Sequence, residues 1–508
     1  MPAMACTITR SVILARWTLV SLLVVAGCGG GGRSDADTSA SATITATGTA
    51  TATDGTGGVT TGAGPTSGTD SGGATTVKFD VGEGESDSSG ETAGDCPPVT
   101  GDALLTGTVY APNQEIPVSG ALVYAGTTPP DPIPQTVYCA ECVELPCGTA
   151  HTLTNPDGSF SLEVPSGTKY VAVQKGQFLR VVELDVQPGE NPLGPDVTSL
   201  PDHNDPANGL YIPKIAVAYG SYDRLEDGLA KLGLGQTNVD NANYEETLVG
   251  GTEQFDLWDN EGDIFGPPAG ISFKGPFAQL LSNYALMEQY HIIFVPCSND
   301  TALSALDDPA VVDNVRKWVE AGGKFYVSDW SNEFIEKVFP QYQEFWTDEF
   351  GDTDLFSVYD SLATVLDPDL LAWLEALPAD LKDINPKNGG NAGHPTVNNL
   401  PTIELVDNWS GVKEIFEILV PDGMGGMVNV GHKVWVEGPG DGDVIPTNTN
   451  WPMTITGQYG CGKLMFTTYH TAESGAYIGL TPQELVLMYL ILEIGVCQTP
   501  YEPPPPQG

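Results

Sequence analysis

The pattern of apolar and polar residues between positions 291 and 332 predicts a strand, an amphipathic helix and a second strand. Residues 292–295 form a continuous apolar run, which is typical of a strand covered on both faces. Asp307 or Asp308 can cap the helix that follows, and Gly322-Gly323 can end it. Residues 325–327 then supply the second strand. The apolar residues of the helix recur at helical spacing: Val312, Val315, Trp318 and Val319.

This unit predicts the position of a functional site. Two strands joined by one helix form a right-handed parallel crossover, so both strands end at the same edge of the sheet. Cys297 follows the first strand and Asp329 follows the second. Ligands bind at this carboxyl edge in open α/β sheets. We therefore expect these two residues to lie at a ligand-binding edge.

Further apolar segments predict an α/β domain over residues 210–498, of the flavodoxin-like three-layer class with a mostly parallel sheet. Residues 215–219 predict an earlier strand and residues 463–469 a late one. Residues 341–410 break the simple alternation and are interpreted as an insertion, with a helix over 362–377. The nearly all-apolar stretch 482–496 is too short to cross a membrane and predicts a helix buried against the sheet.

Residues 96–200 alternate apolar and polar positions over short runs, which predicts a small β-sandwich. Leu105-x-Gly-x-Val109, Val118-x-Gly-Ala121 and Thr154-x-x-x-Gly158-x-Phe160 resemble the carboxypeptidase regulatory-like, or transthyretin-like, domain. The resemblance implies a seven-stranded accessory sandwich without chemistry of its own, used for spacing or weak binding. A cysteine-bearing insertion before Thr154 departs from the short loop of that family.

The first 27 residues predict a lipoprotein signal peptide. Arg10 and Arg16 precede an apolar run at 17–26, and Val25-Ala-Gly-Cys28 matches the bacterial lipobox, in which the cysteine is lipidated. An ordinary signal peptide with a chance cysteine is the alternative. Gly29 after the cysteine favours the outer membrane. We therefore expect a lipid-anchored protein of the cell envelope or cell surface, whose partners are the membrane and other envelope or extracellular macromolecules.

Residues 28–95 are rich in Gly, Ser and Thr and carry almost no large apolar side chains. Such a segment cannot bury enough surface to offset its ordering entropy, so it predicts a disordered tether. Residues 499–508 form a short Pro-rich tail.

The chain is strongly acidic, with 66 Asp and Glu against 20 Lys and Arg and a net charge of −46. This charge excludes nucleic acid as a partner and suits cationic ligands and divalent cations. Asp259, Glu261 and Asp263 alternate as calcium ligands can, although the twelve-residue calcium-loop pattern does not follow Gly262. Surface charge explains these residues better, calcium binding is the alternative, and no other cofactor is predicted.

The cysteines divide between the two folded regions. In an oxidising compartment Cys96, Cys139, Cys142 and Cys147 can form two disulfides in three pairings, and half a zinc site with His151 is the alternative. In the second region Cys461 precedes the last strand and Cys497 follows the last helix. We expect Cys461 and Cys497 to form a disulfide, so that Cys297 is the remaining cysteine of this region.

Four stretches of the α/β region, at 215–219, 291–296, 322–332 and 462–471, resemble the class I glutamine amidotransferase-like superfold. They give a strand ending in Pro296, a helix ending in Ala-Gly-Gly323, a strand that runs into a helix, and Gly-Lys-x-x-x-Thr-x-x-His470. In that family the elbow after the Gly-Gly carries a cysteine nucleophile, and the late histidine is its base. Here Trp330 matches the cysteine and cannot be a nucleophile, whereas His470 matches the base.

Two other nucleophiles lie near the predicted edge. Cys297 lies one strand away and can face His470, which would activate its thiol. Ser331 with His470 and Asp329 is a second conceivable triad, although it lacks the Gly-x-Ser-x-Gly elbow.

The sequence thus favours a non-catalytic envelope lipoprotein that displays a degenerate amidotransferase-like domain for recognition or assembly. One alternative is a thiol-dependent amidase or peptidase-like hydrolase that uses Cys297 and His470. A second alternative is a calcium-dependent adhesion protein.

Overall fold

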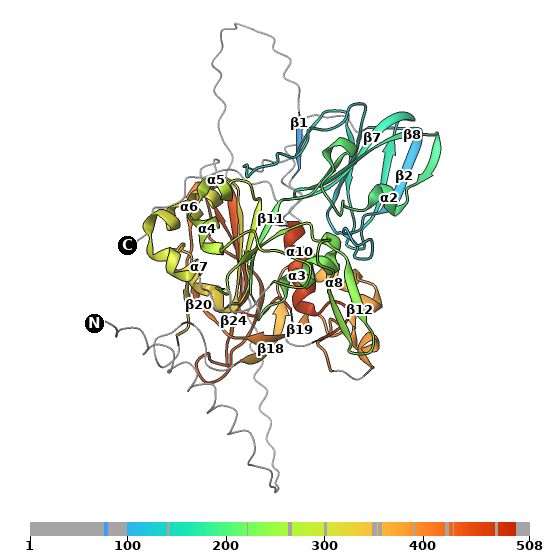
Figure 1. Cartoon of the computed structure of the whole chain (residues 1–508). Coiled ribbons are helices and arrows are strands. Elements are labelled where there is room, and N and C mark those ends of the chain that lie inside the picture. The colour runs from blue at the N-terminus through green and yellow to red at the C-terminus, as the bar shows by residue number, and fades with distance from the viewer. Residues whose placement is uncertain are drawn as a thin grey trace, which may run out of the picture. The chain divides into compact units, whose positions relative to one another are not determined.

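The computed structural model (Figure 1) describes strand β1 (Thr76–Phe79) and residues 99–493. Short gaps in this range fall at 140–142, 221, 263–266, 299–301, 348–352, 354–357, 391–392, 422–425, 430 and 473–475. The predicted signal peptide, the tail and all of the tether except β1 lie outside the described residues, as do Cys28, Cys96, Cys142, Asp263 and Cys497. Within the described residues, no helix is long and apolar enough to cross a membrane.

Two β-sheets form the region predicted as a sandwich, and burial alternates along its strands, as at Phe160, Leu162 and Val164. One sheet has five strands, in the order β10 (Leu210–Tyr211), β8 (Phe178–Val186), β7 (Gly167–Lys175), β3 (Leu122–Gly126) and β5 (Ala150–Leu153). The other has three, in the order β6 (Ser159–Val164), β2 (Ala103–Thr108) and β9 (Gly189–Pro192).

The α/β region is organised around one nine-stranded sheet among the described residues. Its parallel part has the order β14 (Asp256–Asp259), β11 (Ile215–Tyr219), β15 (Ile292–Val295), β16 (Lys324–Ser328) and β25 (Gly462–Thr467). Its antiparallel part continues with β24 (Asn450–Tyr459), β23 (Lys433–Pro439), β18 (Tyr359–Val365) and β19 (Thr402–Asn408). The sheet is therefore mixed, and the prediction of a mostly parallel sheet is wrong.

Two strands of the antiparallel part, β18 and β19, come from residues 341–410, which were interpreted as an insertion. Residues 359–365 alternate buried and exposed side chains and form β18, so residues 362–365 are strand and not the first turn of the predicted 362–377 helix. The helix begins only at α8 (Pro368–Ala376), where the Asp367 carboxylate caps the Asp369 and Leu370 amides. The alternation of buried and exposed side chains over residues 359–365 is therefore what distinguishes a strand from a helix here.

Both faces of the parallel strands are covered, which explains their continuous apolar sequences. Ile293 and Val295 pack in a core with α6 (Pro309–Glu320), whereas Ile292 and Phe294 pack in a second core with α10 (Pro482–Glu493). Asp308 caps α6 through the Ala310 amide, as the sequence predicts. The helices α4 (Phe277–Leu281), α5 (Tyr284–Met287) and α7 (Glu333–Glu336) add to the α6 layer, and α3 (Leu225–Leu229) and the π-helix η2 (Ala230–Leu234) add to the α10 layer.

The other described elements are short. They are β4 (Val143–Pro146), β12 (Thr237–Asp240), β13 (Glu245–Leu248), β17 (Gln343–Phe345), β20 (Val412–Ile415), β21 (Leu419–Pro421), β22 (Met427–Asn429), α2 (Pro195–Thr198), α9 (Ala379–Lys382), and the 3-10 helices η1 (Pro206–Asn208), η3 (Leu303–Asp307), η4 (Asp329–Asn332) and η5 (Asn385–Asn388).

The loop between β3 and β4 carries the cysteine-bearing insertion and contacts the amino edge of the large sheet. His291, just before β15, lies with Nε2 3.0 Å from the Pro134 carbonyl oxygen and 3.1 Å from that of Thr136. Its Nδ1 accepts from the Lys214 amide at 2.8 Å, so Nε2 carries the proton and donates to the loop. Gly322, with φ of 119°, leaves room for the Tyr138 carbonyl, which lies 1.9 Å from where a Cβ would stand.

A disulfide between Cys139 and Cys461 closes this contact. Cys461 lies in the tight turn between β24 and β25, at the same amino edge. The predicted Cys461–Cys497 pair is therefore wrong, because the sandwich loop supplies the partner of Cys461. Cys147 is also disulfide-bonded, so neither Cys139 nor Cys147 can serve the half zinc site considered from the sequence.

Non-reducing peptide mapping of the full chain should find the Cys139 peptide joined to the Cys461 peptide. The double variant Cys139→Ser, Cys461→Ser should lower the free energy of unfolding by about 2–4 kcal/mol, because the bond closes a long loop. A Cys461 peptide joined to Cys497 would contradict the structure.

Lys324 provides a pH-dependent test of the same edge. Its Nζ is buried without a hydrogen-bond partner among the described residues, and burial, with repulsion from Lys463, lowers its pKa to about 7. The unfolded chain holds this proton up to about pH 10.4, so this lysine destabilises the fold most below pH 7 and progressively less above it.

Lys324→Met should therefore raise the free energy of unfolding at about pH 6, and the gain should shrink by about pH 9. Urea unfolding at both pH values measures this. Lys317→Met, at an exposed position on α6, is the control and should show no such pH-dependent gain. An equal effect of the two substitutions would contradict the burial of Lys324.

Candidate functional site

The backbone makes a sharp turn where β16 ends. Asp329 has a φ of 55°, in the left-handed region, and opens η4 directly after Ser328. A side chain other than glycine costs about 1–2 kcal/mol there, and such strain concentrates at functional sites. The sequence comparison with amidotransferases matched Trp330 to the nucleophile, but the residue at the strained turn is Asp329. A carboxylate thus occupies the elbow.

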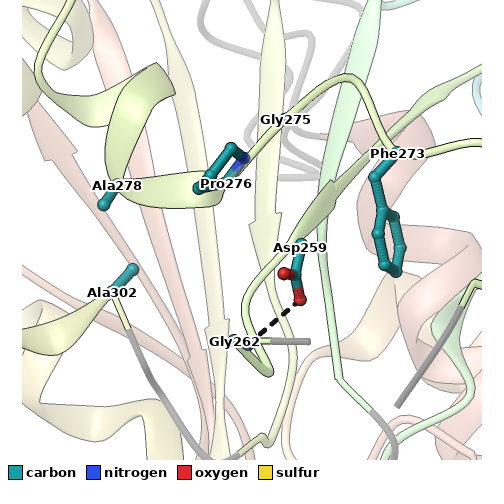
Figure 2. A pocket seen from close by; sticks show the side chains of 7 residues that line it. All are labelled: Asp259, Gly262, Phe273, Gly275, Pro276, Ala278 and Ala302. Atoms are coloured by element: carbon teal, nitrogen blue, oxygen red, sulfur yellow. Dashed lines mark hydrogen bonds between the residues drawn. The ribbon is translucent and has the colours of Figure 1, made fainter. Parts of the chain in front are cut away.

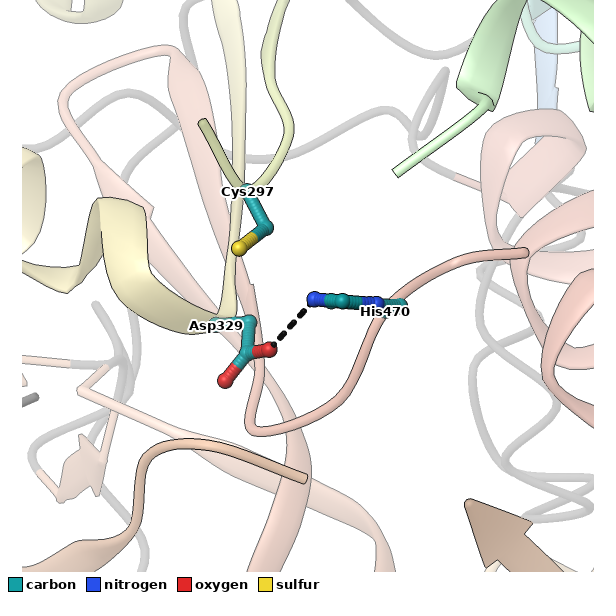
Figure 3. Close-up of side chains that lie close together, drawn as sticks. All are labelled: Cys297, Asp329 and His470. Atoms are coloured by element: carbon teal, nitrogen blue, oxygen red, sulfur yellow. Dashed lines mark ion pairs between the residues drawn. The ribbon is translucent and has the colours of Figure 1, made fainter. Parts of the chain in front are cut away.

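Three side chains from three different strand ends meet at this turn (Figure 3). Cys297 follows β15, Asp329 follows β16 and His470 follows β25, and their ligand atoms all lie within 4.8 Å of one another. His470 Nε2 is 3.1 Å from Asp329 Oδ2. The residues are 1%, 0% and 6% exposed. Cys297 carries a thiol and takes part in no disulfide.

Asp223, which follows β11 and is fully buried, connects the segments that carry these side chains. Its carboxylate accepts hydrogen bonds from the amides of Thr471 (2.7 Å) and Ala472 (3.0 Å) and from the Ser328 hydroxyl (3.0 Å). The Ser328 oxygen in turn accepts from the Cys297 amide at 3.2 Å. Sequence reasoning missed Asp223, although its position just after a buried strand was a usable signal.

The end of β19 also reaches the site. The His470 amide donates to the Asp407 carbonyl at 3.2 Å, and the Trp409 amide donates to Asp329 Oδ1 at 2.9 Å. Gln483 of α10 donates to the His470 carbonyl at 2.8 Å. The end of β19, the last strand of the antiparallel part, therefore lies next to the ends of β16 and β25. There it helps to position both Asp329 and His470.

Burial and pairing shift both pKa values of this ion pair. Burial raises the pKa of Asp329 to about 6, against the opposing effect of His470. Burial lowers the pKa of His470, but the carboxylate of Asp329 more than offsets this, and the pKa is raised to about 8. At neutral pH the pair is thus an imidazolium beside a carboxylate.

Several polar atoms of the pair have no hydrogen-bond partner among the described residues. These buried atoms are Asp329 Oδ2, His470 Nδ1 and His470 Nε2. Oδ2 and Nε2 are close, but they are not aligned as a hydrogen bond. In Figure 3 the Cys297 sulfur and the Asp329 carboxylate both face the Nε2 end of the imidazole. In a catalytic triad, by contrast, the nucleophile and the acid contact different nitrogens of the histidine.

Ser331 lies two residues after Asp329, in η4, and its role is structural. Its buried hydroxyl donates to the Pro296 carbonyl at 2.9 Å, which ties η4 to the end of β15.

Three half-buried aromatic side chains lie beside Asp329. Trp330 packs edge-on against Tyr222 and Trp409, with ring centroids 6.1 Å and 5.0 Å away. They give the site apolar faces next to its charged pair.

The calcium candidates lie at the other end of the same sheet edge. Figure 2 shows a cavity of about 380 Å³ beside Asp259, whose Oδ1 accepts from the amides of Glu261 (2.9 Å) and Gly262 (3.2 Å). This carboxylate oxygen therefore stabilises the loop that directly follows Asp259 in the chain. Asp263 lies outside the described residues, so calcium binding here stays a prediction.

No protein-family model matches the chain, and no curated protein matches it. Among solved structures, a putative ThuA-like protein from Bacteroides uniformis is 10% identical, with a TM-score of 0.27 over 55% of this chain and 90% of that chain. A cytoplasmic protein from Salmonella typhimurium is 12% identical, with a TM-score of 0.24 over 45% of this chain and 83% of that chain. At these values, function has to be argued from the chain's own geometry.

A matched pair of substitutions tests the strained elbow. Asp329→Gly and Asp329→Ala both remove the carboxylate, but only alanine has to hold a side chain at positive φ. Asp329→Ala should therefore be less stable than Asp329→Gly by about 1 kcal/mol. Urea unfolding of both variants measures the difference. An alanine variant as stable as the glycine variant would show that the backbone at this position is not left-handed.

Proposed function

We propose that this chain is a cell-envelope lipoprotein whose α/β domain recognises a ligand at the sheet edge around Cys297, Asp329 and His470. It does so without amidotransferase catalysis. The lipobox at Cys28 and the tether that follows support display on an envelope surface, with the outer membrane favoured by Gly29. Its partners there are the membrane, through the anchor, and other envelope or extracellular macromolecules.

The observation that carries this proposal is the carboxylate at the elbow. An amidotransferase-like mechanism needs a thiol there, because a thiolate is the nucleophile that attacks the amide carbonyl. Asp329 instead directs its carboxylate at His470, which is therefore protonated at neutral pH and is not available as a base. A histidine in this state cannot accept a proton from a neighbouring thiol.

The surroundings suit binding. Polar groups fixed at the end of a sheet, beside half-buried aromatic rings, are typical of ligand-binding sites. Tyr222, Trp330 and Trp409 supply the rings here, and the buried Trp330 Nε1 has no hydrogen-bond partner among the described residues. The acidic surface of the chain favours ligands that are neutral or carry positive charge.

One observation favours a second function, a thiol-dependent amidase or peptidase-like hydrolase. The Cys297 sulfur lies within 4.8 Å of a His470 nitrogen and is not consumed in a disulfide. If Asp329 were to release His470, the imidazole could activate this thiol.

Alkylation of the native full chain separates the two functions. The chain, freed of metal with a chelator, is treated with iodoacetamide across a pH series and mapped by mass spectrometry. Labelling of Cys297 should be much slower than in the denatured chain throughout the pH series, because the sulfur is buried. Denatured chain gives the reference rate, and Cys297→Ser identifies the labelled peptide.

Labelling as fast as in the denatured chain, with a pH midpoint well below the unperturbed thiol value of about 8.5, would overturn the recognition proposal. The hydrolase would then be the better reading, and His470→Ala should return the midpoint to the ordinary thiol range.

A further inference from the structure

We propose that Cys297, Asp329 and His470 form a binding site for one zinc ion, with a fourth coordination position left for the ligand. This inference rests on the proposed function, because it names the chemistry by which that edge would recognise its ligand.

The donor set fits zinc. Zn²⁺ is bound by thiolate, imidazole and carboxylate groups, and three protein ligands with one open position are typical of sites that bind an exogenous group. The sulfur and imidazole donors select zinc over calcium and magnesium, which prefer oxygen ligands alone. Among the described residues, this is the one group of three such side chains whose donor atoms converge.

The spacing also fits. Metal–ligand distances of about 2.0–2.3 Å in a tetrahedron place donor atoms roughly 3.3–3.6 Å apart. His470 Nε2 and Asp329 Oδ2 are 3.1 Å apart, and the three donor atoms lie within 4.8 Å of one another. Rotamer adjustments of about an ångström would complete the coordination, and the backbone positions can stay as they are.

The buried donor atoms that lack hydrogen bonds point to the same conclusion. Asp329 Oδ2 and His470 Nε2 are at least nine-tenths buried, and no described residue gives either a hydrogen bond. Buried polar atoms in native structures nearly always have a hydrogen bond, whereas these two have only each other, as an ion pair at 3.1 Å. In Figure 3 the Cys297 sulfur lies beside this ion pair, so all three donor atoms lie close together.

The surroundings of the site supply charge and rigidity. Asp223 is fully buried nearby, where burial raises its pKa, and the positive charge of a bound dication would favour its ionised form. Binding displaces one proton from the Cys297 thiol and one from the His470 imidazolium, both to solvent, so the thiolate and the neutral imidazole become ligands. The hydrogen bonds of Asp223, Ser328 and the β19 end hold the three strand ends in place.

Cobalt is the probe that reports the predicted ligands directly. The full chain in detergent, stripped with a chelator, is titrated with Co²⁺ and followed by absorption. We expect one Co²⁺ per chain, intense visible bands of tetrahedral geometry, and a thiolate-to-metal charge-transfer band in the near ultraviolet. Added Zn²⁺ should displace the cobalt and abolish all of these bands.

Two substitutions identify the ligands. Cys297→Ser, which nearly preserves volume, should abolish the charge-transfer band, and Asp329→Asn should weaken zinc affinity by more than about tenfold. His203→Ala is the matched control, because His203 lies in an exposed pair with Asp202 and should not affect binding. Circular dichroism and thermal unfolding confirm that each variant is folded.

The outcomes separate this inference from the proposed function. Cobalt that does not bind stoichiometrically, or binds without the charge-transfer band, or keeps that band in Cys297→Ser, overturns the zinc site; the wild-type spectrum decides the question even if a variant fails to fold. An absent zinc site with an unreactive Cys297 leaves the recognition proposal standing. Rapid alkylation of Cys297 at low pH ends the recognition proposal whatever cobalt shows.

Discussion

The carboxylate of Asp223 is the constraint on which the candidate site depends. It is fully buried, and its two oxygens satisfy two backbone amides after His470 and the hydroxyl of Ser328. A buried carboxylate is tolerated only when such hydrogen bonds compensate its lost hydration. The ends of β11, β16 and β25 are therefore held in register, and the residues that follow the last two meet where they do. Without this carboxylate, three strand ends would still share an edge, but the segments after β16 and β25 would lose the acceptor that joins them.

The two edges of the large sheet have different roles. At the amino edge, the sandwich loop gives its carbonyls to His291 and its Cys139 to Cys461, and Gly322 leaves space for the loop backbone. Buried contacts from α10 add to this attachment, including the ion pair between Lys175 of β7 and Glu493. Structural attachment is thus concentrated away from the carboxyl edge, where the strained backbone of Asp329 and the Asp329–His470 pair lie. This division leaves the carboxyl edge available for a ligand.

The chemistry of the carboxyl edge depends on which residue stands at position 329. With a thiol at the elbow, His470 would face a nucleophile and could take its proton. With Asp329 there, the imidazole is held as a cation beside a carboxylate, and the nearest thiol comes from the neighbouring strand. The same three groups that make a poor triad, because they converge on one nitrogen, make a suitable set of metal ligands.

The sequence by itself determined the local features, because these depend on short-range periodicity and capping. The strand–helix–strand unit at 292–328, an aspartate cap at 307 or 308, and the shared edge of Cys297, Asp329 and His470 could all be predicted from it. Tertiary structure decided what depends on contacts between distant segments. The partner of Cys461 comes from a loop more than three hundred residues earlier, with a separation of 322. Asp223 and Trp409 contact the site because the strand ends that carry them come together only when the whole sheet forms. A local sequence pattern does not indicate contacts between segments so far apart in the chain.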